Sequence, residues 1–455
     1  MAEIPQLDMK LADEGWDLSG GKSFNVWGFV DFPADLLAHI NKYRKKLPTI
    51  IDPLTGLQVK TKEKRSPVWT AYDKFFYYNK PTPDDLKNLP KISATFKSAF
   101  EHKFSPIVEN LGMRIAIALD LPTSYNYIAA FDPEKYPEII NNYPTLSQKN
   151  TLQPFGIVSI DFLQPRQTKL KPNGKSLYIQ KDEHGKSIDD GIEIESFTSI
   201  DGDRLVTFEE ALQKYHIGTN KLNGDENLIE NWIEVVDQMA RKEYKHVPRE
   251  KLNKMIDDIH SRIARSFLLK DCALGDCDFT AYNGGTVVNS HKMRYAATHD
   301  YGDICNNLIK TKFTFDPYCG MTKEVFEKLP INLQQQISQS KQKQQNQSVR
   351  DLAQSWASST SEKNFYYVLQ NFPEACREFF ANADVLVRKN VITKIVDSYT
   401  KMTCNGVPLL SKEEAEIFKE YLTERIVHYC DLYVDYLNQN HQNIPDREAG
   451  EDVFL

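Results

Sequence analysis

The spacing of a few polar residues in the middle of the chain constrains its fold more than any other feature. Asp278 precedes Asn283 by five positions, and the triplet Asp300-Tyr301-Gly302 begins seventeen positions after Asn283. The segment between them predicts a β-hairpin, with strands at 286–288 and 293–298 and a turn at 289–292. A loop of four residues lets Asp278 and Asn283 face one cleft from opposite sides. The hairpin would then return Asp300 toward Asn283, so we expect these side chains to meet at one site.

This arrangement suits the transfer of a phosphoryl group. One carboxylate must lie near the attacking hydroxyl, while an amide oxygen and a second carboxylate hold the metal ions that neutralise the phosphates. We therefore assign Asp278 as the candidate catalytic base, and Asn283 and Asp300 as candidate ligands of Mg²⁺ or Mn²⁺. Taken alone, the same residues could form a polar turn and an Asx turn before a glycine, so the neighbouring sequence must decide.

Composition argues against several other classes of protein. The 455 residues carry a net charge of −7, which argues against bulk binding of nucleic acid. No stretch approaches the roughly 20 apolar residues of a membrane-spanning helix. The N-terminus lacks the basic and apolar regions of a signal peptide. We therefore expect a cytoplasmic protein without a transmembrane segment.

Changes in the pattern of apolar, polar and β-prone residues divide the chain into four regions. We expect a loose N-terminal extension over residues 1–64. Residues 65–165, with β-prone runs around one helix, predict an N-terminal lobe that binds a nucleotide. Residues 166–336 predict a mainly helical C-terminal lobe with the candidate catalytic and metal residues, and residues 337–455 predict a helical C-terminal extension. The fold class expected is α+β.

The N-terminal lobe supplies a candidate lysine and a candidate glutamate. Alternating residues predict a strand at 92–97 that ends on Lys97, and the next helix begins at Pro106 and carries Glu109 in its first turn. Taken alone, Glu109 could simply be an acidic residue at the positive end of a helix dipole. Further strands are predicted at 68–72, 75–78, 125–131 and 156–163.

The second half of the chain is predicted to be helical. Apolar stripes predict helices at 228–239 and 252–267, and the second ends shortly before Asp278. A Gln-rich stretch at 337–349 predicts a solvated helix or a linker. Residues 362–440 contain at least three amphipathic helices, which could pack under the C-terminal lobe or form a surface for a partner.

With these elements in order, the chain resembles the atypical kinases of the HipA type and shares features with phosphatidylinositol-kinase-like enzymes. The HipA family's catalytic loop reads roughly N-x-D-x-H-x-x-N, and residues 276–283 read D-C-D-F-T-A-Y-N. Asp276 departs from the first Asn of that pattern, and Thr280 departs from the His. The family's tyrosine–aspartate metal motif is replaced by Asp300-Tyr301-Gly302, closer to the D-F-G of protein kinases. The resemblance covers roughly residues 65–320 and implies a bilobal, protein-kinase-like fold.

The resemblance also implies a nucleotide site for ATP. Lys97 would contact the α- and β-phosphates and Glu109 would pair with it, with Lys91 and Lys103 as rivals of Lys97. No G-x-G-x-x-G phosphate loop occurs, and the nearest candidates are 55–57 and the turn at 66–67. The hinge that binds adenine through backbone groups would lie at Asp161, Phe162 and Leu163.

Several functions remain open at this point. The leading one is an ATP- and metal-dependent phosphotransferase whose acceptor is a protein Ser/Thr hydroxyl or an inositol lipid head group. A basic cluster within residues 42–65 slightly favours a nearby polyanion, although such runs are usually solvated faces. The alternatives are a flipped nucleotide that transfers AMP, and a pseudokinase or adaptor that uses the C-terminal helices. The presence of Asp278, Asn283 and Asp300 argues against the adaptor.

Overall fold

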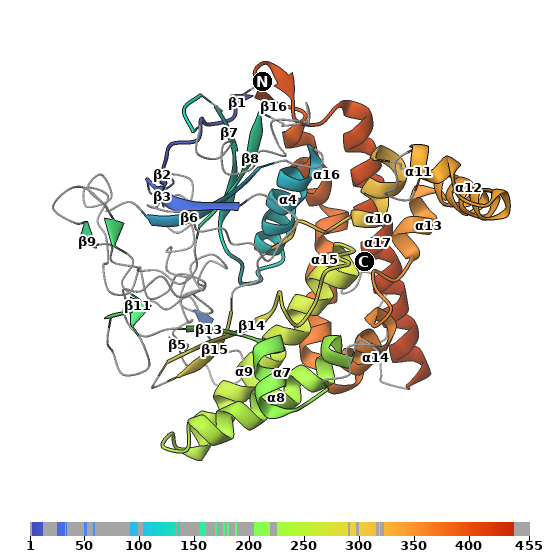
Figure 1. Ribbon diagram of the computed structural model, residues 1–455. Coiled ribbons are helices and arrows are strands. Elements are labelled where there is room, and N and C mark those ends of the chain that lie inside the picture. Colours follow the sequence, from blue (N-terminus) through green and yellow to red (C-terminus); the bar gives the residue numbers. More distant parts are fainter. Residues whose placement is uncertain are drawn as a thin grey trace.

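The chain folds as a mixture of helices and small sheets (Figure 1). The structure, a computed structural model, describes residues 2–11, 25–31, 92–98, 103–132, 134–136, 154–160, 204–218, 225–289, 292–296, 300–314 and 323–440, with Pro33 and Tyr318. It also describes six two-residue strands that form antiparallel pairs: β4 (Ile50–Ile51) with β5 (Gln58–Val59), β9 (Lys169–Leu170) with β10 (Ser176–Leu177), and β11 (Gln180–Lys181) with β12 (Ser187–Ile188).

A five-stranded antiparallel sheet forms one part of the molecule. Its strand order is β2-β3-β6-β8-β7, and helix α4 (Phe104–Ala118) connects β6 to β7 and packs on β7 and β8. Along β6 the buried Ala94 and Phe96 alternate with the half-buried Thr95 and Lys97, as expected for a strand with one face in the core. The strands are β2 (Met9–Leu11), β3 (Asn25–Val30), β6 (Ile92–Ser98), β7 (Asn126–Ala130) and β8 (Phe155–Ile160).

Three of these strands and the helix were expected from the sequence. The strands predicted at 92–97, 125–131 and 156–163 correspond to β6, β7 and β8, and the helix predicted from Pro106 begins two residues earlier, at Phe104. The strands predicted at 68–72 and 75–78 lie outside the described residues.

The expectation of a loose extension over residues 1–64 is wrong for the described part of that region. Strands β2 and β3 belong to the five-stranded sheet, and β3 pairs with β6 over six residues, from Asn25 opposite Lys97 to Val30 opposite Ile92. Strand β1 (Ala2–Glu3) pairs in parallel with β16 (Met402–Cys404), near the other end of the sequence. These pairings join segments far apart in sequence, so no local pattern announces the partner.

A second, smaller sheet lies beside a pair of long helices. Strand β13 (Arg204–Thr207) pairs with β14 (Gly285–Val288), which pairs with β15 (Met293–Tyr295), so the predicted hairpin is present. Its turn is closed by a hydrogen bond from the backbone N–H of Asn289 to the backbone carbonyl oxygen of Lys292. The helical elements of this part are α7 (Phe208–Tyr215), the 3₁₀ helix η3 (Asp225–Asn227), α8 (Ile229–Glu243), α9 (Arg249–Phe267) and the π-helix η4 (Leu268–Ala273).

The C-terminal helices are built into the core. Helix α4 lies between the sheet and α16 (Figure 1), and buried Tyr399 of α16 donates a hydrogen bond to Asn110 Oδ1 of α4 at 2.8 Å. Buried Arg425 of α17 donates to the backbone carbonyl oxygens of Asp271 and Ala353. No helix in the described parts of the chain is long and apolar enough to cross a membrane.

The helices of this region bear out the helical pattern of the sequence, with the Gln-rich stretch lying largely within the mostly exposed α12. They are α10 (Asn306–Leu308), η5 (Ile309–Phe313), α11 (Lys323–Glu327), α12 (Ile331–Gln345), α13 (Val349–Gln354), α14 (Ser361–Asn371), α15 (Pro373–Arg388), α16 (Val391–Tyr399) and α17 (Lys412–Gln439), with the short strand β17 (Val407–Pro408) between the last two.

Candidate functional site

The loop of residues 276–283, called here the Asp278 loop, is separated from η4 by Leu274 and Gly275. Asn283 donates from Nδ2 to Asp278 Oδ2 at 2.7 Å and to the Asp278 carbonyl oxygen at 3.1 Å. The two side chains predicted to share a cleft are therefore in contact. Burial raises the pKa of Asp278, and the nearby Asp303 and Asp300 raise it further, while the bond from Asn283 acts in the opposite direction.

The loop of residues 300–303, called here the Asp300 loop, brings a second carboxylate near enough to affect the pKa of Asp278. Asp300 Oδ1 lies 2.8 Å from Lys97 Nζ, so the end of β6 meets this loop in an ion pair. The two side chains keep 35% and 23% of their exposure, respectively. Asp300 has a φ of +54°, a left-handed backbone conformation that is uncommon outside glycine.

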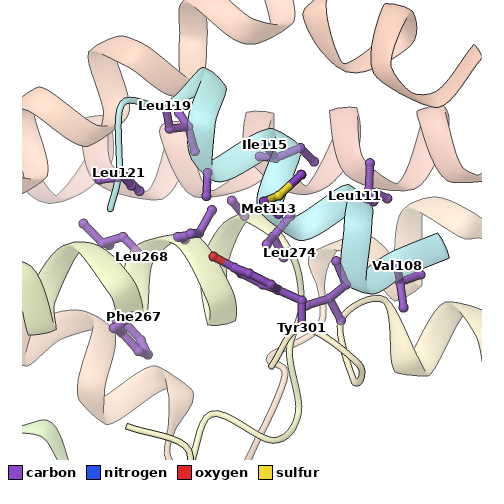
Figure 2. Close-up of a cluster of buried hydrophobic side chains, with 14 of the residues drawn as sticks. Val108, Leu111, Met113, Ile115, Leu119, Leu121, Phe267, Leu268, Leu274 and Tyr301 are labelled. Atoms are coloured by element: carbon purple, nitrogen blue, oxygen red, sulfur yellow. The ribbon is translucent and has the colours of Figure 1, made fainter. Parts of the chain in front are cut away.

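Tyr301 anchors the Asp300 loop beneath α4. Its side chain is fully buried, and its hydroxyl is hydrogen-bonded to Thr123 Oγ1 at 2.8 Å. Figure 2 shows the ring between α4 and the segment that carries Leu268 and Leu274. The ring occupies the place of a side chain at Gly112, because a Cβ there would come within 2.4 Å of it. Glycine at this position of α4 is what allows the ring to lie so close to the helix.

Glu109 is a buried acidic group beside the Asp300 loop, at 3% exposed. Its carboxylate accepts the backbone N–H of Tyr301, and its Oε2 has no hydrogen-bond partner among the described residues. Burial raises the pKa of Glu109 to about 7, although Lys97 acts to lower it. A Cβ at Gly302 would lie 3.3 Å from Oε2, which places this oxygen against the Asp300 loop.

The expected partners Lys97 and Glu109 lie in the same neighbourhood, but the ion pair of Lys97 is with Asp300. Burial disfavours the charge on Lys97, yet the attraction of Asp300 and Glu109 outweighs it and holds the pKa above its ordinary value. A direct Lys97–Glu109 pair therefore stays a prediction for a nucleotide-bound state. Of the rival lysines, Lys103 pairs with Glu414 of α17 at 2.8 Å, and Lys91 lies outside the described residues.

The structure adds Lys270, which the sequence analysis did not name, and gives a partner to Asp276, which was named there as a departure from the family pattern. Lys270 Nζ lies 2.9 Å from Asp276 Oδ2, and both residues are 1% exposed. Lys270 Nζ also donates to the backbone carbonyl oxygen of Asp300 at 2.7 Å, while Asp276 Oδ1 accepts the backbone N–H of Asp278 at 2.8 Å. The available signal was a charged Lys270-Asp271 pair inside an otherwise apolar run.

Other predicted features fall outside the described part of the chain. These are the adenine-binding hinge at Asp161, Phe162 and Leu163, the candidate phosphate loops at 55–57 and 66–67, and most of the basic cluster at residues 42–65, of which the strands at 50–51 and 58–59 alone are described. Their roles stay predictions.

The site provides oxygen ligands that suit Mg²⁺ or Mn²⁺. No three His, Cys, Asp or Glu side chains gather to hold a metal ion within the described residues. The Asn283 amide nitrogen bonds to Asp278, so Asn283 Oδ1 could face a cation, and the Asp300 carboxylate could do so in exchange for its ion pair with Lys97. Mg²⁺ commonly takes one or two protein carboxylates and fills its remaining positions with phosphate oxygens and water. A small set of oxygen donors is therefore sufficient when a nucleotide supplies the rest.

Comparison with known proteins gives no match on sequence and a remote structural similarity. The chain matches no known protein family and no curated protein. Among solved structures it is similar to the proinflammatory kinase CtkA of Helicobacter pylori, with 12% sequence identity and a TM-score of 0.36. The match covers 75% of this chain and 91% of the CtkA chain.

Proposed function

We propose that this chain is an ATP- and divalent-metal-dependent phosphotransferase with a bilobal, protein-kinase-like arrangement. The observation that carries the proposal is that two pairs, Asp278–Asn283 and Lys97–Asp300, lie near enough for the charge of Asp300 to raise the pKa of Asp278. Protein kinases use an Asp, an Asn five residues later, an Asp-aromatic-Gly triplet and a strand lysine for phosphoryl transfer. The glutamate that such sites carry on the helix after the lysine strand has its counterpart in Glu109.

Each residue has a definite role in this proposal. Asp278 would orient the acceptor hydroxyl and take its proton, with Asn283 holding the carboxylate in place through the 2.7 Å hydrogen bond. Asn283 Oδ1 and Asp300 would hold the metal ion, which neutralises phosphate charge when bound. Lys97 would fix the α- and β-phosphates. Most of the rate enhancement would come from positioning and from neutralisation of charge.

The acceptor we favour is a protein Ser or Thr hydroxyl, with an inositol lipid head group as the second choice. Transfer of AMP from a flipped nucleotide would use the same carboxylates. ATP labelled on the γ-phosphate passes its label to the acceptor in phosphoryl transfer, whereas ATP labelled on the α-phosphate does so in AMP transfer. Label transferred only from the α-position would overturn phosphoryl transfer and leave the nucleotide site standing.

The proposal is tested by thermal unfolding with ATP, with and without Mg²⁺ or Mn²⁺. A ligand present at 100 times its dissociation constant stabilises the folded state by about 2.7 kcal/mol. We expect a clear rise in melting temperature with ATP and metal together, and a much smaller rise with either alone. No rise under any of these conditions would contradict the proposal, including the adenylylating alternative, because both require bound ATP.

Lys97 should change partner when the nucleotide binds. Metal at Asp300 competes with Lys97 for the same carboxylate, and the buried Glu109 Oε2 offers the ammonium group a second anion. We predict that Lys97 Nζ lies within about 4 Å of a Glu109 oxygen in a structure with Mg²⁺ and a non-hydrolysable ATP analogue. A different lysine on the phosphates would remove Lys97 from the nucleotide site.

A further inference from the structure

We propose that Lys270 and Asp276 form a positioning pair that fixes the Asp278 loop and the Asp300 loop relative to each other. The inference rests on the proposed function, since it assigns a task to residues that would touch neither nucleotide nor acceptor. It concerns two charged side chains that lie behind the two loops rather than in the cleft.

A continuous chain of contacts connects Asp278, the candidate base, with Asp300, the candidate metal ligand. The backbone N–H of Asp278 donates to Asp276 Oδ1 at 2.8 Å, and the other oxygen, Oδ2, lies 2.9 Å from Lys270 Nζ. The same ammonium group donates to the carbonyl oxygen of Asp300 at 2.7 Å. Asp276 also donates its backbone N–H to the Lys270 carbonyl oxygen at 2.8 Å, so the turn between the pair is closed. A single buried pair therefore links the backbones of the two loops.

The surroundings of the pair exclude water. Both side chains are nearly inaccessible, and the Lys270 ammonium lies 5.9 Å from the ring centre of Phe279 and 5.7 Å from that of Tyr301. Those two aromatic residues belong to the same two loops. Buried ion pairs contribute little net stability, because apolar residues of similar volume often serve as well or better. A role in fixing geometry accounts for the pair better than a role in stability does.

The left-handed backbone conformation of Asp300 is the feature that the Lys270–Asp276 pair would hold in place. A left-handed conformation at a residue other than glycine persists where the surrounding structure determines it. At Asp300 the carbonyl oxygen is held by Lys270, and the following N–H, that of Tyr301, is held by Glu109. Removal of the Lys270 bond should free the peptide to rotate, and the Asp300 carboxylate would then shift relative to Lys97 and Asp278.

The first test measures the loops themselves, without any nucleotide. The single change Lys270→Met leaves an unpaired carboxylate in the core, so the main variant is the double change Lys270→Met with Asp276→Leu, which removes both charges and keeps the volume. A matched control is Lys419→Met, which breaks the ion pair with Asp397 in the C-terminal helices. Amide hydrogen exchange would be followed by mass spectrometry in segments 276–283 and 300–305, with α8 as an internal reference.

We expect the double variant to lose protection in both segments together, by at least about tenfold, while α8 is unchanged. Asp276→Asn keeps an acceptor for the Asp278 N–H and weakens only the tie to Lys270, so it should loosen segment 300–305 more than segment 276–283. The control should match the parent. Loss of protection in neither segment, or equal loss throughout the chain, would overturn the inference.

The second test measures how strongly ATP binding at the candidate site depends on Mg²⁺. Residues that orient metal ligands typically change metal affinity or activity 10–100-fold when they are replaced. The double variant should require at least about tenfold more Mg²⁺ for half-maximal ATP binding, with unchanged affinity for ATP in the absence of metal. An unchanged Mg²⁺ requirement would overturn the positioning role. A parent protein that binds no MgATP would instead contradict the proposed function, and hydrogen exchange would still decide whether the pair joins the two loops.

Discussion

The two sides of the candidate site differ in how completely their contacts are formed. On the loop side, Asp278 and Asn283 are hydrogen-bonded to each other, and the buried Lys270–Asp276 pair ties both loops together. On the α4 side, the lysine pairs with the carboxylate expected to hold metal, and a buried oxygen of Glu109 has no partner among the described residues. The contacts on the loop side are therefore formed without a ligand. On the α4 side, we expect Lys97 to exchange Asp300 for Glu109 as its partner when a ligand binds.

This difference suggests where binding would change the molecule. The Lys97 ammonium group lies beside the Asp300 carboxylate, where a metal ion would bind. It therefore neutralises this carboxylate until metal and phosphate bind. The loop side needs no rearrangement, and preorganised groups are the ones that contribute most to catalysis. We expect ligand-induced changes in β6 and α4, and little change in the Asp278 loop.

The largest expected effect belongs to the loop side and concerns Asp278→Ala. If Asp278 takes the proton of the acceptor, turnover should fall by about 10²–10⁴-fold. Affinity for MgATP should stay within a few-fold of the parent, because this side chain would not touch the nucleotide. Steady-state phosphate transfer and ATP affinity would be measured on the same preparation.

Circular dichroism and melting temperature must accompany this comparison, since a variant that unfolds loses turnover for an unrelated reason. Asp397→Ala serves as the control, because Asp397 pairs with Lys419 in the C-terminal helices and takes no part in the candidate site. Near-normal turnover in Asp278→Ala would contradict the assignment of Asp278 as the base.

A smaller effect is expected at the junction of the two sides, where Tyr301 lies against α4. In an open helix Gly→Ala stabilises by about 1 kcal/mol. At Gly112 the added methyl group would meet Tyr301 Cγ at 2.4 Å, and overpacking of this kind typically costs about 1–3 kcal/mol. We therefore predict that Gly112→Ala destabilises the protein in urea unfolding.

A double-mutant cycle isolates the cause of that loss. If the clash with the Tyr301 side chain is responsible, Gly112→Ala should cost little in a Tyr301→Gly background, where both the ring and the Cβ at 2.7 Å are absent. An equal cost in both backgrounds would show that Tyr301 does not occupy this place, and the anchoring of the Asp300 loop to α4 would have to be abandoned.

A further effect concerns the buried interior behind the loop side and depends on pH. Burial raises the pKa of Asp271 to about 7 from a value of 3.8, against the opposing effects of Ser361 and Arg425. Between these values the folded protein binds more protons than the unfolded chain, so its stability falls as pH rises. Asp271→Asn removes this loss, and the variant should gain on the parent by at most about 1.4 kcal/mol per pH unit.

Urea unfolding at pH 4.5, 6 and 8 would measure this gain. Asp351→Asn is the control of opposite sign, because the hydrogen bond from Ser348 lowers the pKa of Asp351. Its carboxylate contributes stability that is present above the unfolded pKa and is lost as the pH falls. A pH-independent difference for Asp271→Asn would show that this side chain is not held in a dry environment.

The sequence was most informative where spacing within a short stretch determines the contact. Asp278 and Asn283 lie in one loop, and a short hairpin separates them from Asp300, so their convergence follows from local structure. The strand ending on Lys97 and the helix with Glu109 follow from period-two and helical patterns in the same way. The described helices beyond residue 350 are long amphipathic segments, which periodicity predicts well.

Other features depended on contacts between distant segments. Strand β3 pairs with β6 more than sixty residues away, so residues 1–64 looked like an extension. The choice of Lys97 between Asp300 and Glu109 depends on charges that only the folded chain brings together. Lys270 lies within an apolar run, where sequence alone gives no sign of its two buried oxygen partners.

The central claim is that the Asp300 carboxylate receives the metal ion that accompanies ATP. Titration calorimetry with ATP, in the presence and absence of Mg²⁺, on the parent and on Asp300→Ala tests it most directly. Asp397→Ala, which removes a carboxylate from a lysine pair in the C-terminal helices, is the matched control. We predict Mg²⁺-dependent binding in the parent and the control, and loss of the Mg²⁺-dependent part in Asp300→Ala. Unchanged affinity with unchanged dependence on Mg²⁺ in Asp300→Ala would contradict the account.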